Sequence, residues 1–485
     1  MFYMLKPNIL FRKYGDLGYV TDNALFGYRV HGDEKLYPGE RYVSDSGAVM
    51  LQILNKKPKN IDKVVGELRD VYTNVAYDTL KQDSIEFYDS LVKDGFLSRG
   101  DTSEECLIAA GNGSNNLSCR GICRDKPNID CVKNSIAQRE TLLKGIHIEL
   151  ATECNERCAH CYIPHECKIK KIDVGLVGRI LTEAKCLNVL NITLSGGEPL
   201  LHDNFIGILQ KCRALDFSVN VLSNLTLLTD AMMDEMVKNP LLSVQTSIYS
   251  MTDSVHDAIT GVHGSLNKTI SGLRKLQSIG VPLQISCPVM RMNKASFADV
   301  VSFGESNGIQ VATDFVIFAS LDHKGGNLEC RLSLDDIRSA FSLRATDEYV
   351  RNLRELAAER EALSSKDPIC SVCRYYLCVS VDGTAYPCPG WQNKIVGDLN
   401  KQTINEIWNN SRIVKELRNV RCANFNKCVH CQDRGYCNVC MMSNSNENKD
   451  GDAFRISEFH CRVAALLHRQ VDDYVNNLKV KKPTF

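Results

Sequence analysis

The hydrophobic pattern of residues 1–98 predicts a small α+β unit in which strands come before helices. Short apolar segments at 9–14, 18–21 and 26–30 are separated by Gly, Asp and Asn, as strands are separated by turns. Apolar residues then recur at helical spacing, at Ile61, Val64, Val65 and Leu68 and again at Ile85, Tyr88 and Val92. Three strands followed by three helices predict a winged-helix-like domain over residues 1–100.

A different pattern begins near residue 141 and predicts a parallel sheet. Apolar segments of strand length alternate with segments of helical periodicity such as 266–279 and 297–306. The six expected strands are 146–150, 189–194, 217–222, 242–248, 281–286 and 315–318. Repeated strand–helix alternation is typical of an α/β domain whose sheet is open or curled into a partial barrel. We assign this domain to residues 141–345 and expect its functional groups at the carboxyl ends of the strands.

The remaining segments have other textures. Residues 101–140 are polar and rich in Gly, Asn and Ser, which predicts a linker. A charged helical stretch over 332–363 leads into a cysteine-rich region, which we assign to 346–465. Residues 466–485 are expected to form a C-terminal tail.

Composition and charge narrow the class of protein. The chain has 485 residues, and its 58 basic residues balance 58 acidic ones, so the net charge is zero. This balance offers little to phosphate groups, and we expect neither nucleic acid nor a membrane as partner. The first residues lack the pattern of a signal peptide, and no apolar run approaches the roughly 18 residues of a membrane span. We therefore expect a cytoplasmic protein.

Cysteine is unusually frequent, with 22 residues that are unevenly placed. In a reducing compartment such thiols usually bind metal or carry out redox chemistry. Three lie within 154–161 and ten within 370–461, while five others are scattered as packed thiols would be. The linker holds Cys106, Cys119, Cys123 and Cys131. Their wide and irregular spacing favours free thiols in a loop over a further metal site.

The strongest chemical signal is the loop after the first strand of the predicted sheet. Cys154, Cys158 and Cys161 are separated by three and then two residues. Three thiolates at this spacing fold round one iron–sulfur cube and leave one iron open to another ligand. The alternative is a zinc knuckle, which would take its fourth ligand from His160 or Cys167.

This loop resembles the cluster loop of the radical S-adenosylmethionine (radical SAM) superfamily. The second expected strand ends in Ser-Gly-Gly-Glu-Pro at 195–199, which matches the GGEP motif of that superfamily. The resemblance covers about 146–320 and implies a partial (β/α)6 barrel, similar to a TIM barrel, that binds a [4Fe–4S] cluster and SAM. It also implies that the glycines let the backbone approach the methionine moiety and that Glu198 meets its ammonium group. The implied SAM-binding residues are Gly196, Gly197, Glu198, Asn224 and Ser247.

One position departs from the family pattern. Members more often have Arg where this chain has Thr260, which puts one contact to SAM in doubt.

The C-terminal cysteines resemble the signature of the SPASM subgroup, many of whose members modify peptides. The chain has Cys373-x9-Gly383-x4-Cys388, then Cys428-x2-Cys431-x5-Cys437-x2-Cys440, and finally Cys461. Family members often have three residues before the sixth cysteine, and this chain has two. Asp382 and Gly383 form a two-residue turn signal between expected strands at 375–381 and 384–387, which predicts a hairpin.

The SPASM resemblance implies two auxiliary [4Fe–4S] clusters and so three clusters in the chain. One auxiliary set is Cys428, Cys431, Cys437 and Cys461, and the other is Cys370, Cys373, Cys388 and Cys440. Cys378 competes for the second set, but its position inside an expected strand favours a packed thiol. Without the resemblance, the four cysteines from 428 to 440 would indicate a zinc ribbon.

The N-terminal unit resembles the recognition element of ribosomal-peptide maturases, in which a leader peptide adds a strand to a sheet edge. The implied partners are a precursor peptide bound through its leader and an electron donor such as flavodoxin or ferredoxin. The expected activity is a crosslink in the peptide, foremost a thioether from a Cys sulfur to a carbon. Such a crosslink is a net oxidation, and auxiliary clusters suit the uptake of the remaining electron.

Other functions stay open. A carbon–carbon crosslink has the same redox balance, whereas a peptide epimerase would be redox-neutral and would need a hydrogen-atom donor. Cys330 follows the sixth expected strand on the rim and is the candidate donor, and Cys287 is expected to pack under helices. A non-catalytic iron–sulfur electron carrier or a peptide-binding regulator is the alternative of another class, but neither has a use for the GGEP motif.

Overall fold

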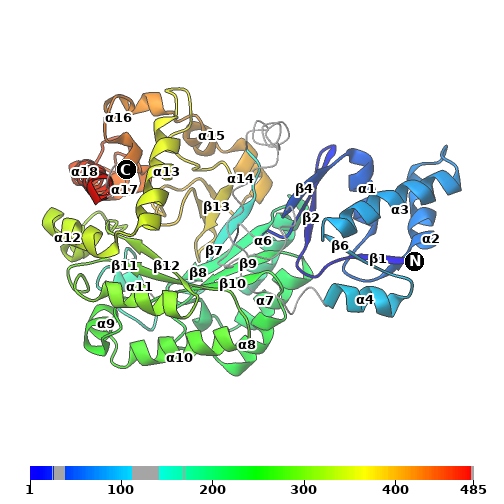
Figure 1. Ribbon diagram of the computed structural model, residues 1–485, viewed down its shortest axis with the longest axis horizontal. Coiled ribbons are helices and arrows are strands. Elements are labelled where there is room, and N and C mark those ends of the chain that lie inside the picture. The colour runs from blue at the N-terminus through cyan, green and yellow to red at the C-terminus, as the bar shows by residue number, and fades with distance from the viewer. Residues whose placement is uncertain (24–25, 27–38, 112–140, 168–169, 482–485) are drawn as a thin grey trace.

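The computed structural model describes residues 1–23, 26, 39–111, 141–167 and 170–481. An N-terminal α+β domain lies beside a central sheet covered by helices, and a mainly helical region follows it (Figure 1). Within the described residues no helix is both long and apolar enough to span a membrane.

In its described residues, the N-terminal domain holds two small sheets and four helices. Its strands are β1 (Phe2–Leu5), β2 (Leu10–Tyr14), β3 (Leu17–Thr21), β4 (Glu40–Val43), β5 (Lys59–Asn60) and β6 (Leu97–Gly100), and its helices are α1 (Asp45–Ile53), α2 (Ile61–Val71), α3 (Tyr77–Lys93) and α4 (Ser103–Gly111). One sheet has the order β5-β1-β6 and the other β2-β3-β4. The apolar stripes of α2 and α3 pack into one core with Tyr3, Leu51 and Leu97. The expected strands at 9–14 and 18–21 form as β2 and β3, and the helices α1, α2 and α3 follow them, while β1, β5 and β6 form a second sheet that was not expected.

Two details of this domain differ from the sequence-based expectation. The strand that pairs with β3 is β4, at 40–43, while the strand expected at 26–30 falls, apart from Phe26, outside the described residues. The start of the expected linker is helical, because α4 packs on β1 and β6 and buries Cys106 beside Met4. Cys119, Cys123 and Cys131 lie outside the described residues.

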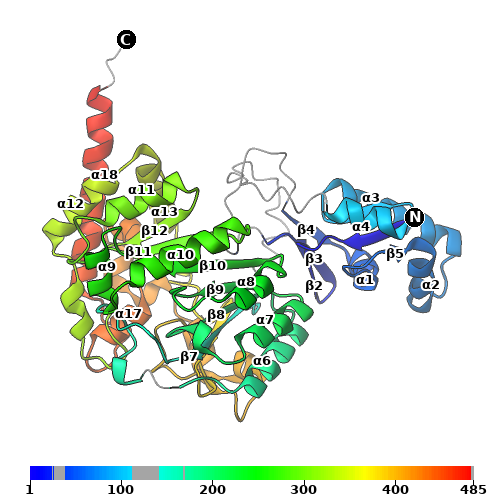
Figure 2. The same cartoon turned by 90° about the horizontal axis from the view of Figure 1, so that it is seen from below.

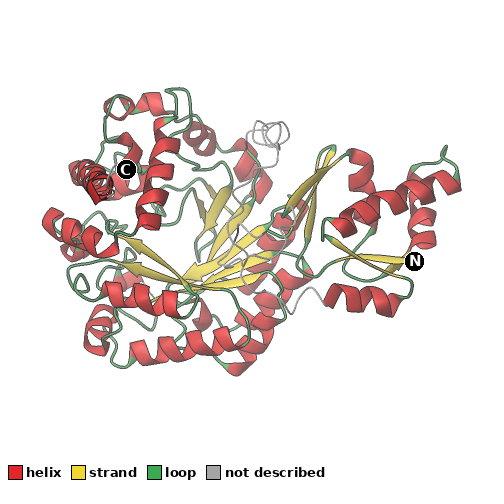
Figure 3. Ribbon diagram, viewed as in Figure 1, coloured by secondary structure: helices red, strands yellow, loops and turns green. Residues whose placement is uncertain are grey.

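The central sheet begins with six parallel strands separated by helices. The strands are β7 (Gly145–Ala151), β8 (Asn191–Gly196), β9 (Ser218–Leu222), β10 (Leu242–Ser247), β11 (Leu283–Pro288) and β12 (Gln310–Asp314). The helices between them are α6 (Val174–Cys186), α7 (Phe205–Ala214), α8 (Asp230–Val237), α9 (Asp253–Thr260), α10 (Ser265–Ser278) and α11 (Phe297–Ser306). Each strand neighbours the next in chain order, and the helices cover the outer face of the sheet (Figure 3). The expected α/β fold with a partial barrel is confirmed.

The sixth strand was expected at 315–318 and lies instead at Gln310–Asp314. β12 is the edge strand of the sheet, and its residues Gln-Val-Ala-Thr-Asp are alternately exposed and half-buried, so they carry no apolar run. Phe315 and Ile317 are buried, but in the loop after the strand. The apolar residues at 315–318 therefore belong to a partly buried loop and not to the strand that their pattern predicted.

The C-terminal region joins the same sheet. The expected hairpin forms as β13 (Tyr376–Val379) and β14 (Thr384–Tyr386), with Gly383 at φ +84° in the turn, and β15 (Gly397–Asp398) follows. β13 pairs in parallel with β7, so the nine-stranded sheet runs from β12 through β7 to β15. The helices are α12 (Leu334–Arg344), α13 (Asp347–Glu361), α14 (Ile404–Asn410), α15 (Arg412–Arg418), α16 (Asn426–Val429), α17 (Met441–Glu447) and α18 (Glu458–Lys481).

Most of the expected C-terminal tail is helical. α18 continues to Lys481, and Val471 packs in one apolar cluster with Phe341 of α12 and Val350 of α13. The long helix is the red element in Figure 2.

The N-terminal domain contacts the barrel at the ends where the parallel strands begin. Arg12 on β2 is 2% exposed and donates from Nε to the carbonyl of Val189, just before β8. Tyr14 donates to the carbonyl of Asn188, and Leu10 packs against Leu190 and Leu241. The carboxyl ends of the strands, where the sequence motifs lie, are therefore at the opposite end of the barrel from these contacts.

Candidate functional site

The loop that carries Cys154, Cys158 and Cys161 follows β7 and is fixed by backbone hydrogen bonds. The amides of Arg157 and Ala159 donate to the carbonyls of Thr260 and Ile259, at 2.8 and 2.9 Å. These carbonyls close the carboxyl end of α9, so the helix holds the loop in place. All three thiols are half-buried.

The three thiols lie close enough to influence one another. Burial raises the pKa of Cys158, and the charges of Glu156, Cys161 and Cys154 raise it further. Tyr249, which follows β10, lies with its hydroxyl 3.9 Å from the Cys158 sulfur. A bound metal centre would reverse this pKa shift, because it stabilises the thiolate.

The two glycines of the GGEP segment seat the end of β8 against the cysteine loop. Gly196 has φ +125°, and the amide of Gly197 donates to the carbonyl of Ala151 at 2.6 Å. A Cβ at Gly197 would lie 2.3 Å from the carbonyl oxygen of Glu153 and 2.4 Å from that of Thr152. Backbone atoms cannot move aside as a flexible side chain does, so glycine is needed there for packing.

Glu198 has a different environment from the expected contact with an ammonium group. It is fully buried, and one carboxylate oxygen accepts hydrogen bonds from the Leu200 amide at 3.0 Å and the Ser223 hydroxyl at 2.7 Å. The other oxygen accepts from the Asn224 amide at 2.8 Å. Burial raises the pKa of Glu198 to about 7. In this structure the carboxylate ties the end of β8 to the end of β9.

Asn224 and Ser247 lie at the carboxyl ends of β9 and β10, as expected. The Asn224 side chain donates to Oδ1 of Asn155 at 2.9 Å, and Asn155 in turn donates to the Thr226 hydroxyl at 2.7 Å. Asn155 was not singled out from the sequence, although its place between two cysteines of the motif was a usable signal. It fixes the cysteine loop relative to β9.

Thr260 does not face open space. It is 1% exposed, and its hydroxyl is 2.7 Å from that of Ser265 at the start of α10. The buried Thr260 side chain therefore does not take the place of the arginine that family members more often have at this position.

The structure brings together the thiols expected to hold one auxiliary cluster. Burial raises the pKa of Cys388 to about 12, with further contributions from Cys440, Cys370 and Cys373. Cys370, Cys388 and Cys440 line a cavity of about 410 Å³. His147 of β7 and Thr193 of β8 also line it, so the cavity opens on the inner face of the barrel.

The structure also brings together the other expected set, Cys428, Cys431, Cys437 and Cys461. Burial raises the pKa of Cys437 to about 12, and Cys461, Cys428 and Cys431 raise it further. The pKa of Cys428 is raised to about 11 by burial and by Cys461, Cys431 and Cys422. Cys422 is a buried thiol that sequence reasoning did not single out.

Each auxiliary set offers four thiols, a donor set that suits a [4Fe–4S] cluster and also a zinc ion. Within the described residues, no group of three or more His, Cys, Asp or Glu side chains converges as the ligands of one ion do. The roles of these thiols as ligands stay predictions.

Two other cysteines have defined positions. Cys378 is fully buried in β13. It lines the 410 Å³ cavity as a packed thiol beside Cys370, Cys388 and Cys440. Cys330 ends the short helix η3 (Gly326–Cys330) and packs, half-buried, against a cluster that includes Tyr249 and Met290. Cys287 is fully buried in the barrel core, as expected.

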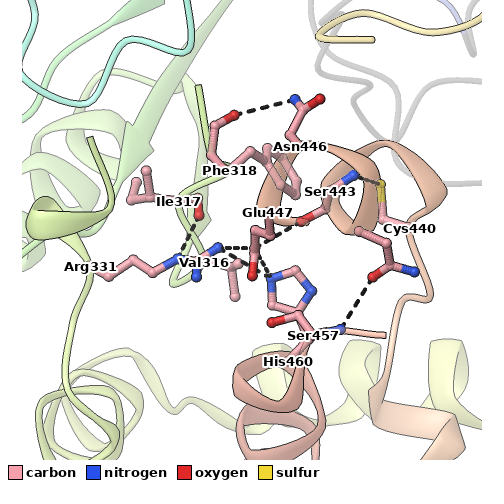
Figure 4. Close-up of polar contacts among 12 residues, drawn as sticks. Val316, Ile317, Phe318, Arg331, Cys440, Ser443, Asn446, Glu447, Ser457 and His460 are labelled. Carbon is pink, nitrogen blue, oxygen red and sulfur yellow. Dashed lines mark hydrogen bonds and ion pairs between the residues drawn. The ribbon is translucent and has the colours of Figure 1, made fainter. Parts of the chain in front are cut away.

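A buried ionic network joins the barrel to the C-terminal region (Figure 4). Arg331, directly after η3, donates from Nε to the carbonyl of Ile317 at 2.8 Å and forms an ion pair with Glu447 at the end of α17. His460 on α18 lies with Nε2 3.3 Å from the same carboxylate. The Ser443 amide in α17 donates to the sulfur of Cys440 at 3.5 Å. None of the charged residues was foreseen, because no local pattern marks such long-range pairs.

Comparison with known proteins gives two domain matches. Residues 148–304 match the radical SAM superfamily, and 370–433 match the SPASM iron–sulfur cluster-binding domain. These matches confirm the resemblance stated from the sequence, including SAM and iron–sulfur clusters as cofactors.

Curated relatives share low identity with the chain. An AdoMet-dependent heme synthase of Methanosarcina barkeri is 22% identical over 320 residues, which cover 59% of this chain and 90% of the relative. A PqqA peptide cyclase of Gluconobacter oxydans is 24% identical over 214 residues, which cover 44% of this chain and 56% of the relative. The match to this cyclase therefore spans only about half of its length.

Solved structures share the fold. Streptococcus suis SuiB bound to its precursor peptide SuiA aligns with a TM-score of 0.60 at 15% identity, over 94% of this chain and 99% of that one. The enzyme anSMEcpe with bound AdoMet and a peptide aligns with a TM-score of 0.55 at 15% identity, over 69% and 98%. Because the SuiB alignment covers 94% of this chain, it includes most of the N-terminal domain.

Proposed function

We propose that this chain, an enzyme with a radical SAM domain and a SPASM domain, modifies a ribosomally made precursor peptide. The relatives support a peptide substrate, since one group acts on PqqA and SuiB was solved with SuiA. The observation that carries the proposal is the pairing of a barrel cavity with two neighbouring sets of four thiols. A heme synthase among the relatives marks the main competing substrate class.

The cofactors would be held by three sets of thiols. Cys154, Cys158 and Cys161 would bind the cluster that chelates SAM, with Gly196, Gly197, Asn224 and Ser247 at the surrounding strand ends. Bound there, SAM and its cluster supply a 5′-deoxyadenosyl radical that removes a hydrogen atom from substrate. The residues of the chain orient the peptide beside these groups and keep water away from it.

The chemistry proposed is a crosslink, foremost a thioether between a Cys sulfur and a carbon. Two hydrogens leave the substrate in such a reaction, so the enzyme needs an acceptor for one further electron. The two auxiliary sets, Cys370/Cys373/Cys388/Cys440 and Cys428/Cys431/Cys437/Cys461, would hold clusters that serve as this acceptor. A carbon–carbon crosslink has the same balance.

Mass spectrometry of the cognate peptide tests this function. The probes are synthetic copies of the Cys-containing short peptides found by sequencing the regions that flank the gene, each incubated with reconstituted enzyme, SAM and a reductant without air. A crosslink lowers the peptide mass by two hydrogens, and tandem fragmentation locates it. An unchanged mass with an inverted residue would mean an epimerase, and an unmodified peptide would mean another substrate class.

The N-terminal domain is proposed to bind the leader of that peptide. In the β2-β3-β4 sheet, side chains of β2 contact the barrel, while β4 is the other edge of the sheet. An extended leader added at β4 gains main-chain hydrogen bonds. Deleting residues 1–111, up to the end of α4, should weaken leader binding while reductive SAM cleavage continues. Unchanged leader affinity in a titration would contradict this role.

We further propose that the enzyme works in the cytoplasm with a small electron donor such as flavodoxin or ferredoxin. The first cluster needs a low-potential electron for each SAM cleavage, and this compartment supplies such donors. Replacement of dithionite by reduced flavodoxin in the peptide assay tests the choice.

A further inference from the structure

Glu149 lies on the inner face of the barrel. It belongs to β7, in which Ile146, Ile148 and Leu150 pack into the core between sheet and helices. Because side chains alternate along a strand, Glu149 shares the opposite face with His147, which lines the 410 Å³ cavity. Glu149 itself is buried beside this cavity and is not among the residues that line it.

The surroundings of Glu149 leave one oxygen without a partner. The side chain is 1% exposed, and Oε1 accepts hydrogen bonds from the Tyr386 hydroxyl at 2.7 Å and from Nε2 of Gln392. Oε2 is buried and has no hydrogen-bond partner within the described residues. A buried carboxylate oxygen left unpaired destabilises a fold by about 1–3 kcal/mol or more, so its presence calls for a ligand.

The carboxylate also stands between two predicted cofactor sites. From His147 at the cavity, β7 runs through Glu149 to the loop of Cys154, and each residue of a strand advances by about 3.3 Å. Tyr386, which donates a hydrogen bond to Glu149, is the last residue of β14 and comes two residues before Cys388.

The other ionisable groups nearby are less suited to take a proton. Burial lowers the pKa of His147 to about 4, and its Nε2 is hydrogen-bonded to the Ser195 hydroxyl. Both oxygens of Glu198 are occupied by hydrogen bonds from the protein. Of the two carboxylates, Glu149 is the one that keeps an oxygen without a hydrogen-bond partner within the described residues.

We propose that Glu149 is a catalytic residue that accepts the proton released when the peptide crosslink forms. The inference rests on the proposed crosslinking function. In a thioether crosslink a C–H bond and an S–H bond break and an S–C bond forms. With SAM and the clusters bound, the carbon would give up a hydrogen atom to the SAM-derived radical, and an oxidised auxiliary cluster held by the cysteine sets would take up one electron. The remaining proton, from sulfur, goes to Oε2 of Glu149.

The state of Glu149 in the free enzyme suits this role. Burial raises its pKa to about 7, while the hydrogen bonds from Tyr386 and Gln392 oppose the shift and Asp382 adds to it. The other ionisable groups that face it are Tyr162, which is half-buried, and Cys378, which is fully buried, and burial raises the pKa of each. Below pH 7 the carboxyl group is protonated and accepts nothing, so crosslinking should decline as the pH falls through 7.

The variant Glu149→Gln tests the proposal in the reconstituted holoenzyme with the cognate precursor peptide. Glutamine keeps an acceptor for Tyr386 but cannot take the proton. We expect 5′-deoxyadenosine formation, and deuterium transfer to it from a labelled peptide, within about twofold of wild type. The ratio of crosslinked product to 5′-deoxyadenosine should fall at least tenfold. Difference infrared spectra without substrate should lose a carboxyl signal that titrates near neutrality.

Two companion variants separate catalysis from structure. Tyr386→Phe removes a hydrogen bond that favours the charged form, so it should keep crosslinking while its pH midpoint moves upward. Glu149→Asp keeps a carboxylate and should restore part of the product ratio lost in Glu149→Gln. A normal product ratio in Glu149→Gln, with wild type making the crosslink, would overturn the role of Glu149 alone. A wild-type product of unchanged mass would overturn it together with the crosslinking function, since no proton is then released.

Discussion

Arg331 and Glu447 form an ion pair between the barrel and the C-terminal region, with their side chains only 10% and 13% exposed. Glu447 ends α17, which begins after Cys440, and His460 beside it precedes Cys461. Each of these two cysteines belongs to a different auxiliary set. The pair therefore fixes segments from both sets relative to the barrel in which the substrate is expected.

Loss of either partner should destabilise the protein. Glu447→Gln leaves the buried charge of Arg331 without its carboxylate, and breaking such a pair costs about 3–5 kcal/mol. Arg331→Met leaves Glu447 with His460 and should cost less. Equilibrium urea unfolding under anaerobic conditions measures the change. The double variant Arg331→Met/Glu447→Gln leaves no lone charge and should lose less than the sum of the single variants. Additive losses would mean that the two side chains do not interact.

Gly197 should tolerate no side chain. In Gly197→Ala the new Cβ meets two backbone carbonyl oxygens within 2.4 Å, so the cysteine loop has to shift. We expect SAM cleavage to be lost and about four irons per chain to disappear, while the auxiliary clusters stay. Gly178→Ala is the matched control, because a Cβ in that position of α6 meets no atom within 4 Å. It should be neutral or stabilising by up to about 1 kcal/mol. Normal SAM cleavage by Gly197→Ala would refute the packing role.

The contrast between β11 and β12 shows what the sequence could predict of the fold. β11 is buried and pairs on both sides, so its apolar pattern marked it correctly. β12 is an edge strand with polar residues, and the apolar residues that follow it fill a loop. The apolar pattern of a sequence indicates which residues are buried. In this sheet it identified the central strand β11 but not the edge strand β12.

The candidate site divides in a similar way. The cysteine motifs were recognisable from the chain because their spacing resembles the family patterns, and the division of these cysteines into ligand sets stays a prediction. The partners of Glu198 and Arg331 depend on contacts between segments far apart in sequence, such as Arg331 with Glu447. No local pattern encodes them, because each residue would look the same on any polar surface.

Iron analysis tests the three ligand sets. We expect three [4Fe–4S] clusters, hence about twelve irons per chain after anaerobic reconstitution. The triple variant Cys154→Ala/Cys158→Ala/Cys161→Ala should retain about eight. Cys212→Ala, which removes a fully buried thiol of α7, is the control and should retain all twelve. Zinc in the C-terminal sites of anaerobically purified protein would contradict two auxiliary clusters.

The burial of Glu149 away from water should also affect how the free energy of unfolding depends on pH. Burial raises its pKa from 4.5 to about 7 in the folded protein, so the folded state holds the proton more tightly than the unfolded state. Below pH 4.5 the group is protonated in both states and has no effect. As the pH rises from 4.5 to 7, the unfolded chain ionises first, and the wild type loses up to about 3 kcal/mol of unfolding free energy from this group.

Glu149→Gln has no proton to lose at this site, so its unfolding free energy relative to wild type should increase by that amount between pH 4.5 and 8. Glu198 also has a raised pKa, but it is present in both proteins, and its contribution cancels in the difference. Urea unfolding of both proteins at four pH values in this range measures the effect. A difference that does not change with pH would mean that Glu149 titrates near its ordinary value. The carboxylate would then be hydrated, and its unpaired oxygen would need no ligand from the substrate.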